Sequence, residues 1–453
     1  MTAPTTEQLR AAVDAAMPAI RSDLEDLVRI PSVSSEGPIS PDVARSAEAV
    51  AALLADAGLP DVRVLDAEDG APAVVGRIPA PPGAPTVLLY AHHDVQPTGA
   101  LEEWSSPPFE PTERDGRLYG RGAADDKAGV MAHVGAVRVL REAFPDGLPV
   151  GVTVFVEGEE EAGSPTFASF LSEHADLLAA DVVVIADSSN WEVDVPAFTT
   201  SLRGFVEIFV EVRTHTVEAH SGMFGGLFPD ALMALCRTLA ALHDDAGRVA
   251  VPGLVHAPVP EVDLDEAALR AEAGVLEGVA SIGEGSAATR VWSTPSATIL
   301  AIDAPRTDLA GNVLLPVARA KVGVRIAPGQ DPAAAQAAVC EHLVASAPWG
   351  AAVACEPGVT GKAVALVPSG AAADVARGAF ADAWDGTEPV HMGVGGSIPF
   401  IGDVAAQFPD ATVLVVGPGD PAAGWHGPDE SVDLGVLRRL TLAEVLLLAR
   451  LGA

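Results

Sequence analysis

Basic residues, cysteines and long apolar runs are all scarce in this sequence. Only 27 of its 453 residues are Lys or Arg, against 62 Asp or Glu, which gives a formal net charge of −35. This charge argues against nucleic acid and anionic membrane surfaces as partners, because both are polyanions. No uninterrupted apolar run reaches the roughly 18 residues that a membrane span needs. The N-terminal MTAPTTEQLR lacks the basic start and apolar core of a signal peptide, so we expect a cytoplasmic protein.

The few cysteines also exclude a disulfide framework. Cys236, Cys340 and Cys355 are odd in number, far apart and set in apolar patterns. We expect them to be buried, reduced thiols without a catalytic role, since none has the electropositive setting that makes a thiolate.

Apolar residues make up 49% of the chain and predict an alternation of helices and strands. Four nearly continuous apolar runs are typical of strands that helices bury on both faces: TVLLYA (86–91), VGVTVFVE (150–157), DVVVIAD (181–187) and ATVLVVG (411–417). Segments with helical spacing of apolar residues lie at both ends of the chain and after residue 126. Together they predict an α/β sandwich.

The middle of the chain predicts a second domain. Its segments follow the order strand, helix, strand, strand, helix, strand, beginning with FVEIFVEVR (205–213) and ending with GAAVACEP (350–357). This β-α-β-β-α-β order is that of ferredoxin-like domains. Because ATVLVVG resembles the N-terminal strands, we expect residues 196–365 to be inserted into a larger domain of residues 1–195 and 366–453.

Metal-ligand residue types follow four of the predicted strands. His92 and Asp94 follow the first, an acidic run at 157–161 the second, Asp187 the third, and GPGDPAAGWHG (417–427) the fourth. In open α/β sheets, ligands collect beyond the carboxyl ends of the strands. Carboxylates that converge there repel one another and need cations to offset their charge. A pair of divalent metals is therefore predicted.

Two local ambiguities affect the ligand set. In GRGAADDKAG (120–129), Asp125 is placed to bridge two metals, but Asp125 or Asp126 could merely cap the helix that follows. His92 and His93 are adjacent, and successive strand side chains point to opposite faces, so only one can face the metals. We choose His92 because Asp94, two residues on, lies on the same side and can accept the imidazole's other N–H.

Several motifs resemble one family of enzymes. AHHDVQP, GRGAADDKAG and VEGEEEAGS, with HSGMFGG, VRIAPGQ, GGSIPF and WHGPDE, occur in the order found in the co-catalytic metallopeptidases. That family includes the carnosinase-type cytosolic dipeptidases, which the motifs resemble most, the aminoacylases, the glutamate carboxypeptidases and the desuccinylases. The resemblance implies a mixed-sheet, zinc-binding α/β catalytic domain with an inserted ferredoxin-like lid and dimerisation domain.

The resemblance also implies roles for residues of the catalytic domain. His92, Asp125 and Asp187 would bind one metal, and Asp125, Glu161 and His426 the other. Glu160 would be the general base for a water that bridges the metals, and Asp94 would orient His92. Two divalent ions per subunit are implied, with Zn first and Mn or Co as alternatives.

The resemblance also implies substrate contacts, and all of them except Ser397 lie in the inserted domain. Arg325 would bind the substrate's terminal carboxylate, although a surface ion pair is the commoner fate of an arginine. His220 would reach the developing oxyanion in a neighbouring subunit's site, which implies a homodimer. Asn312 and Ser397 would be further substrate contacts, or loop residues bonded to their own backbone.

Three functions remain open at this point. The first is a dipeptidase for substrates with a free C-terminal carboxylate. The second is an amidohydrolase acting on N-acyl amino acids or a specialised amide with the same metals and base. The third, a metal-stabilised dimeric binding protein without catalysis, is disfavoured because every catalytic residue of the motifs is present.

Overall fold

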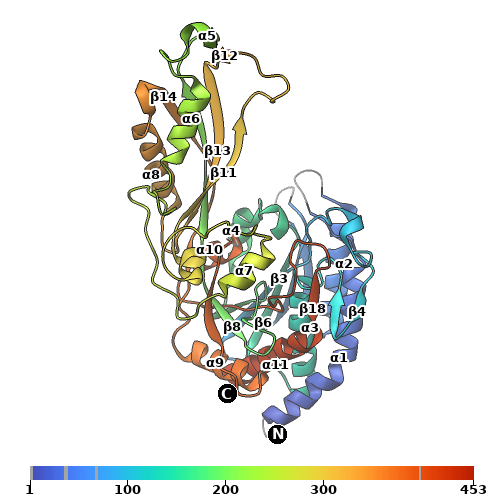
Figure 1. Cartoon of the computed structure of the whole chain (residues 1–453). Helices are drawn as coiled ribbons and strands as arrows, with labels where there is room; N and C mark the ends of the chain where they lie inside the picture. Colours follow the sequence, from blue (N-terminus) through green and yellow to red (C-terminus); the bar gives the residue numbers. More distant parts are fainter. Residues whose placement is uncertain (1–3, 35–38, 67–69, 397–398, 453) are drawn as a thin grey trace. The chain divides into compact units, whose positions relative to one another are not determined.

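The computed structural model describes residues 4–34, 39–66, 70–396 and 399–452, and the chain divides into two compact units (Figure 1). The first contains residues 1–200, 366–392 and 399–453, and the second contains residues 201–365 and 393–398. The chain thus crosses between the units after residues 200 and 365, and the short segment 393–398 groups with the second unit.

A six-stranded mixed sheet forms the centre of the first unit, in the order β1-β2-β6-β3-β7-β17. Its strands are β1 (Asp61–Leu65), β2 (Ala73–Ile78), β3 (Thr86–His92), β6 (Gly151–Glu157), β7 (Val182–Ile185) and β17 (Thr412–Val415). The four predicted apolar runs are β3, β6, β7 and β17, and these four strands run parallel to one another. β1 and β2 are antiparallel additions at one edge. The mixed α/β fold predicted from the sequence is therefore confirmed.

Helices bury both faces of this sheet. They are α1 (Thr6–Val28), α2 (Pro41–Asp56), α3 (Lys127–Ala143), α4 (Phe167–Leu178), α9 (Ala371–Ala383), α10 (Pro399–Gln407) and α11 (Leu434–Leu451). Leu89 packs into the large core that α1, α3 and α11 share. The next residue, Tyr90, points the other way and stacks on Phe400 of α10, with ring centroids 3.5 Å apart. This alternation fixes which face each side chain at the end of β3 can reach.

The second unit contains a four-stranded antiparallel sheet in the order β11-β13-β9-β14. Its elements follow the predicted β-α-β-β-α-β order: β9 (Gly204–Arg213), α6 (Ala231–Ala240), β11 (Ser296–Asp303), β13 (Val317–Ile326), α8 (Pro332–Ala345) and β14 (Ala352–Gly361). α6 and α8 bury one face of the sheet in a separate core. β11 and β14 are its edges.

Shorter elements complete both units. The first unit has β4 (Thr112–Arg114), β5 (Arg117–Tyr119), β18 (Ser431–Asp433) and the 3-10 turns η1 (Leu101–Glu103) and η2 (Glu160–Ala162). The second has β10 (Ala219–His220), α5 (Ser221–Phe224), α7 (Glu266–Glu272), the π-helical turn η3 (Thr289–Ser293), β12 (Val313–Leu314) and η4 (Pro348–Gly350). β8 (Ala197–Leu202), β15 (Val364–Ala365) and β16 (Val390–Val394) form a small sheet.

Two further findings bear on the sequence analysis. Cys236 is exposed, and Cys340 and Cys355 are only half-buried, so the expectation of three buried thiols is wrong. The error arises because all three lie in the second unit, whose helices and strands each keep one face open to solvent. Within the described ranges, no helix has both the length and the apolar character of a membrane span.

Candidate metal centre

The ligand-type side chains come from the carboxyl ends of parallel strands. His92 is the last residue of β3, Asp187 follows β7 by two residues, and Glu160 and Glu161 begin the turn after β6. His426 lies in the loop after β17. Asp125 and Asp126 immediately precede α3. All of these residues belong to the first unit.

Asp125 lies between the two histidines. Its Oδ1 is 3.0 Å from Nε2 of His92, and its Oδ2 is 3.0 Å from Nε2 of His426. On the far side of His426, Oε2 of Glu161 is 3.3 Å from the same Nε2. One carboxylate therefore connects two potential ligand groups, which is the arrangement that a bridging ligand requires.

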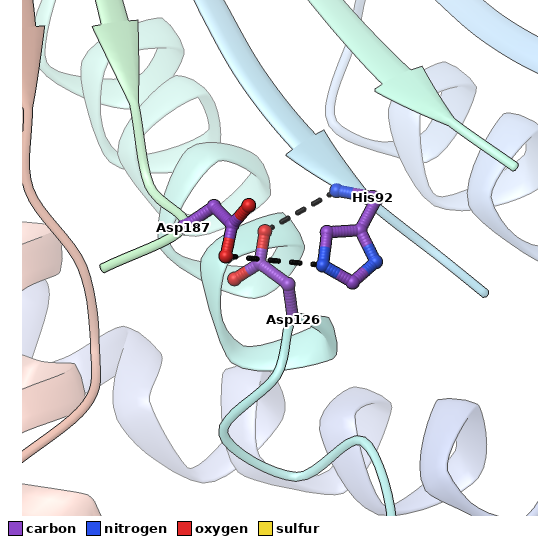
Figure 2. Close-up of side chains that lie close together, drawn as sticks. All are labelled: His92, Asp126 and Asp187. Atoms are coloured by element: carbon purple, nitrogen blue, oxygen red, sulfur yellow. Dashed lines mark hydrogen bonds and ion pairs between the residues drawn. The ribbon is translucent and has the colours of Figure 1, made fainter. Parts of the chain in front are cut away.

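Two sets of three side chains have ligand atoms within 4.8 Å of one another. The sets are His92, Asp126 and Asp187, shown in Figure 2, and Asp125, Glu161 and His426. In the first set, Oδ1 of Asp187 is 3.9 Å from Nε2 of His92. The structure thus brings together all five residues that the sequence predicted as ligands, and adds Asp126.

Asp126 was considered only as a possible helix cap. Its side chain makes no capping hydrogen bond to α3. Instead Oδ2 accepts the backbone N–H of His92 at 3.2 Å, and Oδ1 is buried without a partner (Figure 2). The sequence signal was present in the adjacent aspartates of AADDK, but spacing alone did not show that both would turn inward.

Burial and mutual repulsion shift the pKa values of the clustered side chains. Burial, followed by the charges of neighbouring carboxylates, raises the pKa of Asp187 and of Glu160 well above the usual range. Hydrogen bonds that His426 donates to the carboxylates of Asp125 and Glu161 raise its pKa to about 10. Carboxylate oxygens and imidazole nitrogens are donors that suit divalent Zn, Mn and Co, and bound cations would offset this repulsion. The residues present therefore fit a pair of divalent metals.

Asp94 positions more of the site than the sequence analysis expected. Nδ1 of His92 donates to the backbone carbonyl of Asp94 at 3.1 Å, which leaves the lone pair of Nε2 free for a metal. The carboxylate of Asp94 lies 3.4 Å from the same Nδ1. That carboxylate also accepts the backbone N–H groups of Glu160 at 3.2 Å and Glu161 at 3.0 Å. One side chain thus fixes the backbone of both glutamates.

His93 faces away from the cluster. Its Nε2 donates to the carbonyl of Pro72 at 2.9 Å, and burial lowers the pKa of the ring to about 4. Of the two adjacent histidines, His92 is the one that lies with the carboxylates.

Glu430 is a positioning residue that the sequence analysis did not assign. Its buried carboxylate accepts the backbone N–H groups of Gly122, Ala124 and Asp125 at 3.0–3.1 Å and pairs with Arg121 at 2.6 Å. Arg121 in turn donates to the carbonyl of His426 at 3.0 Å. In the sequence, this residue is the final Glu of the WHGPDE motif. Its role depends on contacts with residues more than 300 positions earlier in the chain, which the motif does not show.

Three of the predicted substrate contacts lie in the second unit. His220 is exposed and accepts the N–H of Gly222 at the start of α5. Asn312 precedes β12, which pairs with β10, and its carbonyl accepts the N–H of Ser221 at 3.0 Å. Arg325, near the end of β13, is half-buried over the ring of Phe205 at 5.0 Å. Ser397 lies outside the described residues.

Acidic and imidazole ligands at the end of a mixed α/β sheet, with an inserted α+β unit, define a metal-dependent hydrolase. The chain belongs to Peptidase family M20/M25/M40, whose model matches residues 88–450. The family resemblance seen in the motifs is thereby confirmed.

Individual relatives agree with this assignment. The chain is 36% identical over 414 residues to the cysteinylglycine-S-conjugate dipeptidase of Corynebacterium striatum, covering 90% of each protein. It is 33% identical over 292 residues to the Beta-Ala-His dipeptidase of Rattus norvegicus, covering 60% of this chain and 58% of the relative. The crystal structure of human carnosine dipeptidase 1 superposes with a TM-score of 0.77 at 25% identity, covering 99% of this chain and all of the other. The structure of the dipeptidase Dug1p from Saccharomyces cerevisiae, at 23% identity and a TM-score of 0.79 over 99% of this chain and 98% of that one, shows the shared fold.

Proposed function

We propose that this protein is a metal-dependent dipeptidase that hydrolyses the peptide bond of dipeptides with a free C-terminal carboxylate. The observation that carries the proposal is the carboxylate of Asp125, held 3.0 Å from both His92 and His426. The dipeptidase names of the relatives support the choice of substrate class.

The proposed ligands form two sets that share one residue. His92, Asp125 and Asp187 hold one metal ion, and Asp125, Glu161 and His426 hold the other. Zn is the first choice, with Mn or Co as alternatives, because imidazole and carboxylate donors suit all three. When bound, the pair of ions polarises the peptide carbonyl and makes water a better nucleophile at neutral pH.

Glu160 is the proposed general base. Its backbone N–H donates to the carboxylate of Asp94 at 3.2 Å, and its side chain is not among the proposed ligands, so the carboxylate is left to accept a proton. Glu160 takes a proton from the attacking water and delivers it to the leaving amine. Asp94 acts as the positioning residue for both His92 and Glu160.

The second unit supplies Arg325, His220 and Asn312 as proposed substrate contacts. Arg325 binds the terminal carboxylate, His220 of a second copy donates to the developing oxyanion, and Asn312 and Ser397 add further contacts. Residues 1–195 and 366–453 would then be the catalytic domain, and residues 196–365 the lid and dimerisation domain. A cytoplasmic location is part of the same proposal.

A homodimer is supported by the edge of the second unit's sheet. β11 has a free edge and exposes the apolar side chains of Ile299, Leu300 and Ile302. Such an edge favours pairing with another strand. A second copy of this chain is the proposed partner.

The proposal is tested by amine release from dipeptides, tripeptides and N-acyl amino acids, with protein reloaded separately with Zn and Mn. Cleavage confined to dipeptides with a free carboxylate supports it. Cleavage mainly of N-acyl amino acids would instead assign the same site to an amidohydrolase.

A further inference from the structure

Two arginines of the second unit lie close together, and neither has an acidic partner among the described residues. Arg203 immediately precedes β9, and Arg325 lies near the end of β13. Ser296 connects them: it is the cross-strand neighbour of Arg325, and its hydroxyl accepts a hydrogen bond from Nη1 of Arg203 at 3.2 Å. Directly opposed residues of antiparallel strands have Cβ atoms about 5 Å apart. The two guanidinium groups therefore belong to one small region of the unit.

Arg203 is buried and incompletely hydrogen-bonded. Only 9% of the residue is exposed, its Nε has no partner, and its other contact is a weak one of 3.5 Å to the carbonyl of Thr294. Burial and then the charge of Arg325 lower the pKa of Arg203 to about 10. In a chain with 62 acidic residues, no carboxylate in the described part of the sequence pairs with either guanidinium.

Gly395 packs closely against Arg203. A Cβ atom at Gly395 would lie 3.2 Å from Nη2 of Arg203, so a side chain at this position would crowd the guanidinium group. The ring of Phe205 lies under Arg325 and restrains its guanidinium. Planar guanidinium groups offer paired donors that match the two oxygens of a carboxylate.

We propose that Arg203 and Arg325 together bind one carboxylate group, the C-terminal carboxylate of the dipeptide. The identity of the ligand rests on the proposed function, whereas the site itself rests on the two unpaired guanidinium groups. Arg203 is thus an additional specificity-determining residue, and it makes preference for a free carboxylate depend on two cations.

Arginine footprinting tests the site without turnover. Phenylglyoxal modifies arginine side chains, and peptide mass spectrometry measures the rate at each position in the metal-loaded protein. Propionate, but not its neutral isostere propionamide, is expected to slow modification of Arg203 and Arg325. Arg237, on α6 with its guanidinium over Trp349, is the internal control and should be unaffected. In Arg203→Met, propionate should no longer protect Arg325, and unchanged protection there would overturn the proposal.

Kinetics with a dipeptide and its C-terminal amide test whether the two arginines bind the carboxylate of the substrate. For cysteinylglycine, Arg203→Met should raise KM about 10- to 100-fold with a smaller change in kcat. The KM of Arg203→Lys should lie between those of Arg203→Met and wild type, because lysine keeps the positive charge but lacks the paired donors of a guanidinium group. For the C-terminal amide, kcat/KM should stay within about threefold, and Arg237→Met should match wild type for both. Equal losses on acid and amide would assign Arg203 a structural role and overturn the inference. If the wild-type enzyme cleaves the dipeptide and its C-terminal amide equally well, the proposed substrate class is wrong. The phenylglyoxal experiment then still tests whether Arg203 and Arg325 bind a carboxylate.

Discussion

The backbone N–H of Asp125 donates a 3.0 Å hydrogen bond to the buried carboxylate of Glu430. The same carboxylate holds two further N–H groups of the turn at residues 122–125 and the guanidinium of Arg121. The position of the proposed bridging ligand is therefore set by a residue that has no direct contact with the proposed metals.

Glu430→Gln should weaken divalent metal binding by about 10- to 100-fold, as is usual when a residue supporting a ligand is changed. It should also lower the free energy of unfolding by about 3–5 kcal/mol, because Arg121 is left buried without its anion. Competition with a chelator and urea unfolding measure the two effects. Glu102→Gln, at an exposed glutamate of η1, is the matched control. Wild-type metal affinity in Glu430→Gln would contradict the positioning role.

Replacing each of the adjacent histidines should separate metal binding from stability. His92→Ala should lose metal during dialysis, because it removes the ring that faces Asp125. His93→Ala should keep its metal but lose about 2–4 kcal/mol of stability, since a buried ring and its bond to Pro72 are removed. Metal analysis and thermal unfolding give both values. Metal retained in His92→Ala and lost in His93→Ala would reverse the assignment.

Local patterns were enough to predict the four buried strands and the ligand-type residues that follow them. The apolar runs of β3, β6, β7 and β17 identify parallel strands, and parallel strands bring His92 and Asp187 to one edge. Long-range contacts were not predictable in the same way. The inward turn of Asp126 and the reach of Glu430 to residue 125 depend on the folded backbone, which no local spacing encodes.

The sequence analysis did not connect Arg203 with Arg325 for the same reason. Arg203 and Arg325 are 122 positions apart in sequence, and only the register of β9, β11 and β13 places both beside Ser296. The burial of the cysteines was predicted wrongly for a different reason. An apolar sequence pattern does not show which face of a helix or strand in a two-layer unit stays exposed to solvent.

A buried ion pair should make stability fall as the pH rises above 6.5. Nδ1 of His133 is 2.9 Å from Glu444, and Nε2 is 2.9 Å from the carbonyl of Tyr90. Burial lowers the pKa of His133, but the charge and hydrogen bond of Glu444 outweigh it and raise the pKa above 6.5. The folded protein therefore holds this proton to higher pH than the unfolded chain, so the contribution is complete below pH 6.5 and is lost as pH rises through the folded pKa.

Glu444→Gln removes the charge that raises this pKa. Urea unfolding from about pH 6 to 9 with saturating metal should show the wild type losing stability with pH more steeply than the variant. Parallel curves for the two proteins would show that the pair does not titrate in this range.

The free edge of β11 should determine oligomeric state. Ile302, which is 42% exposed on β11, is changed to Lys, and Val359, 65% exposed on the opposite edge strand β14, provides the matched control. A charged side chain on an edge strand opposes pairing with another strand. Light scattering should find Ile302→Lys monomeric and Val359→Lys dimeric, with turnover reduced only in the former because His220 acts in the partner's site. A dimeric Ile302→Lys would place the interface elsewhere.

The most direct test of the account is the metal content and turnover of Glu160→Gln. The variant should retain two divalent ions per chain, because Glu160 is not among the proposed ligands, while kcat falls by about 10²- to 10⁴-fold from loss of the general base. A metal-loaded Glu160→Gln with kcat within about threefold of wild type would contradict the proposed mechanism.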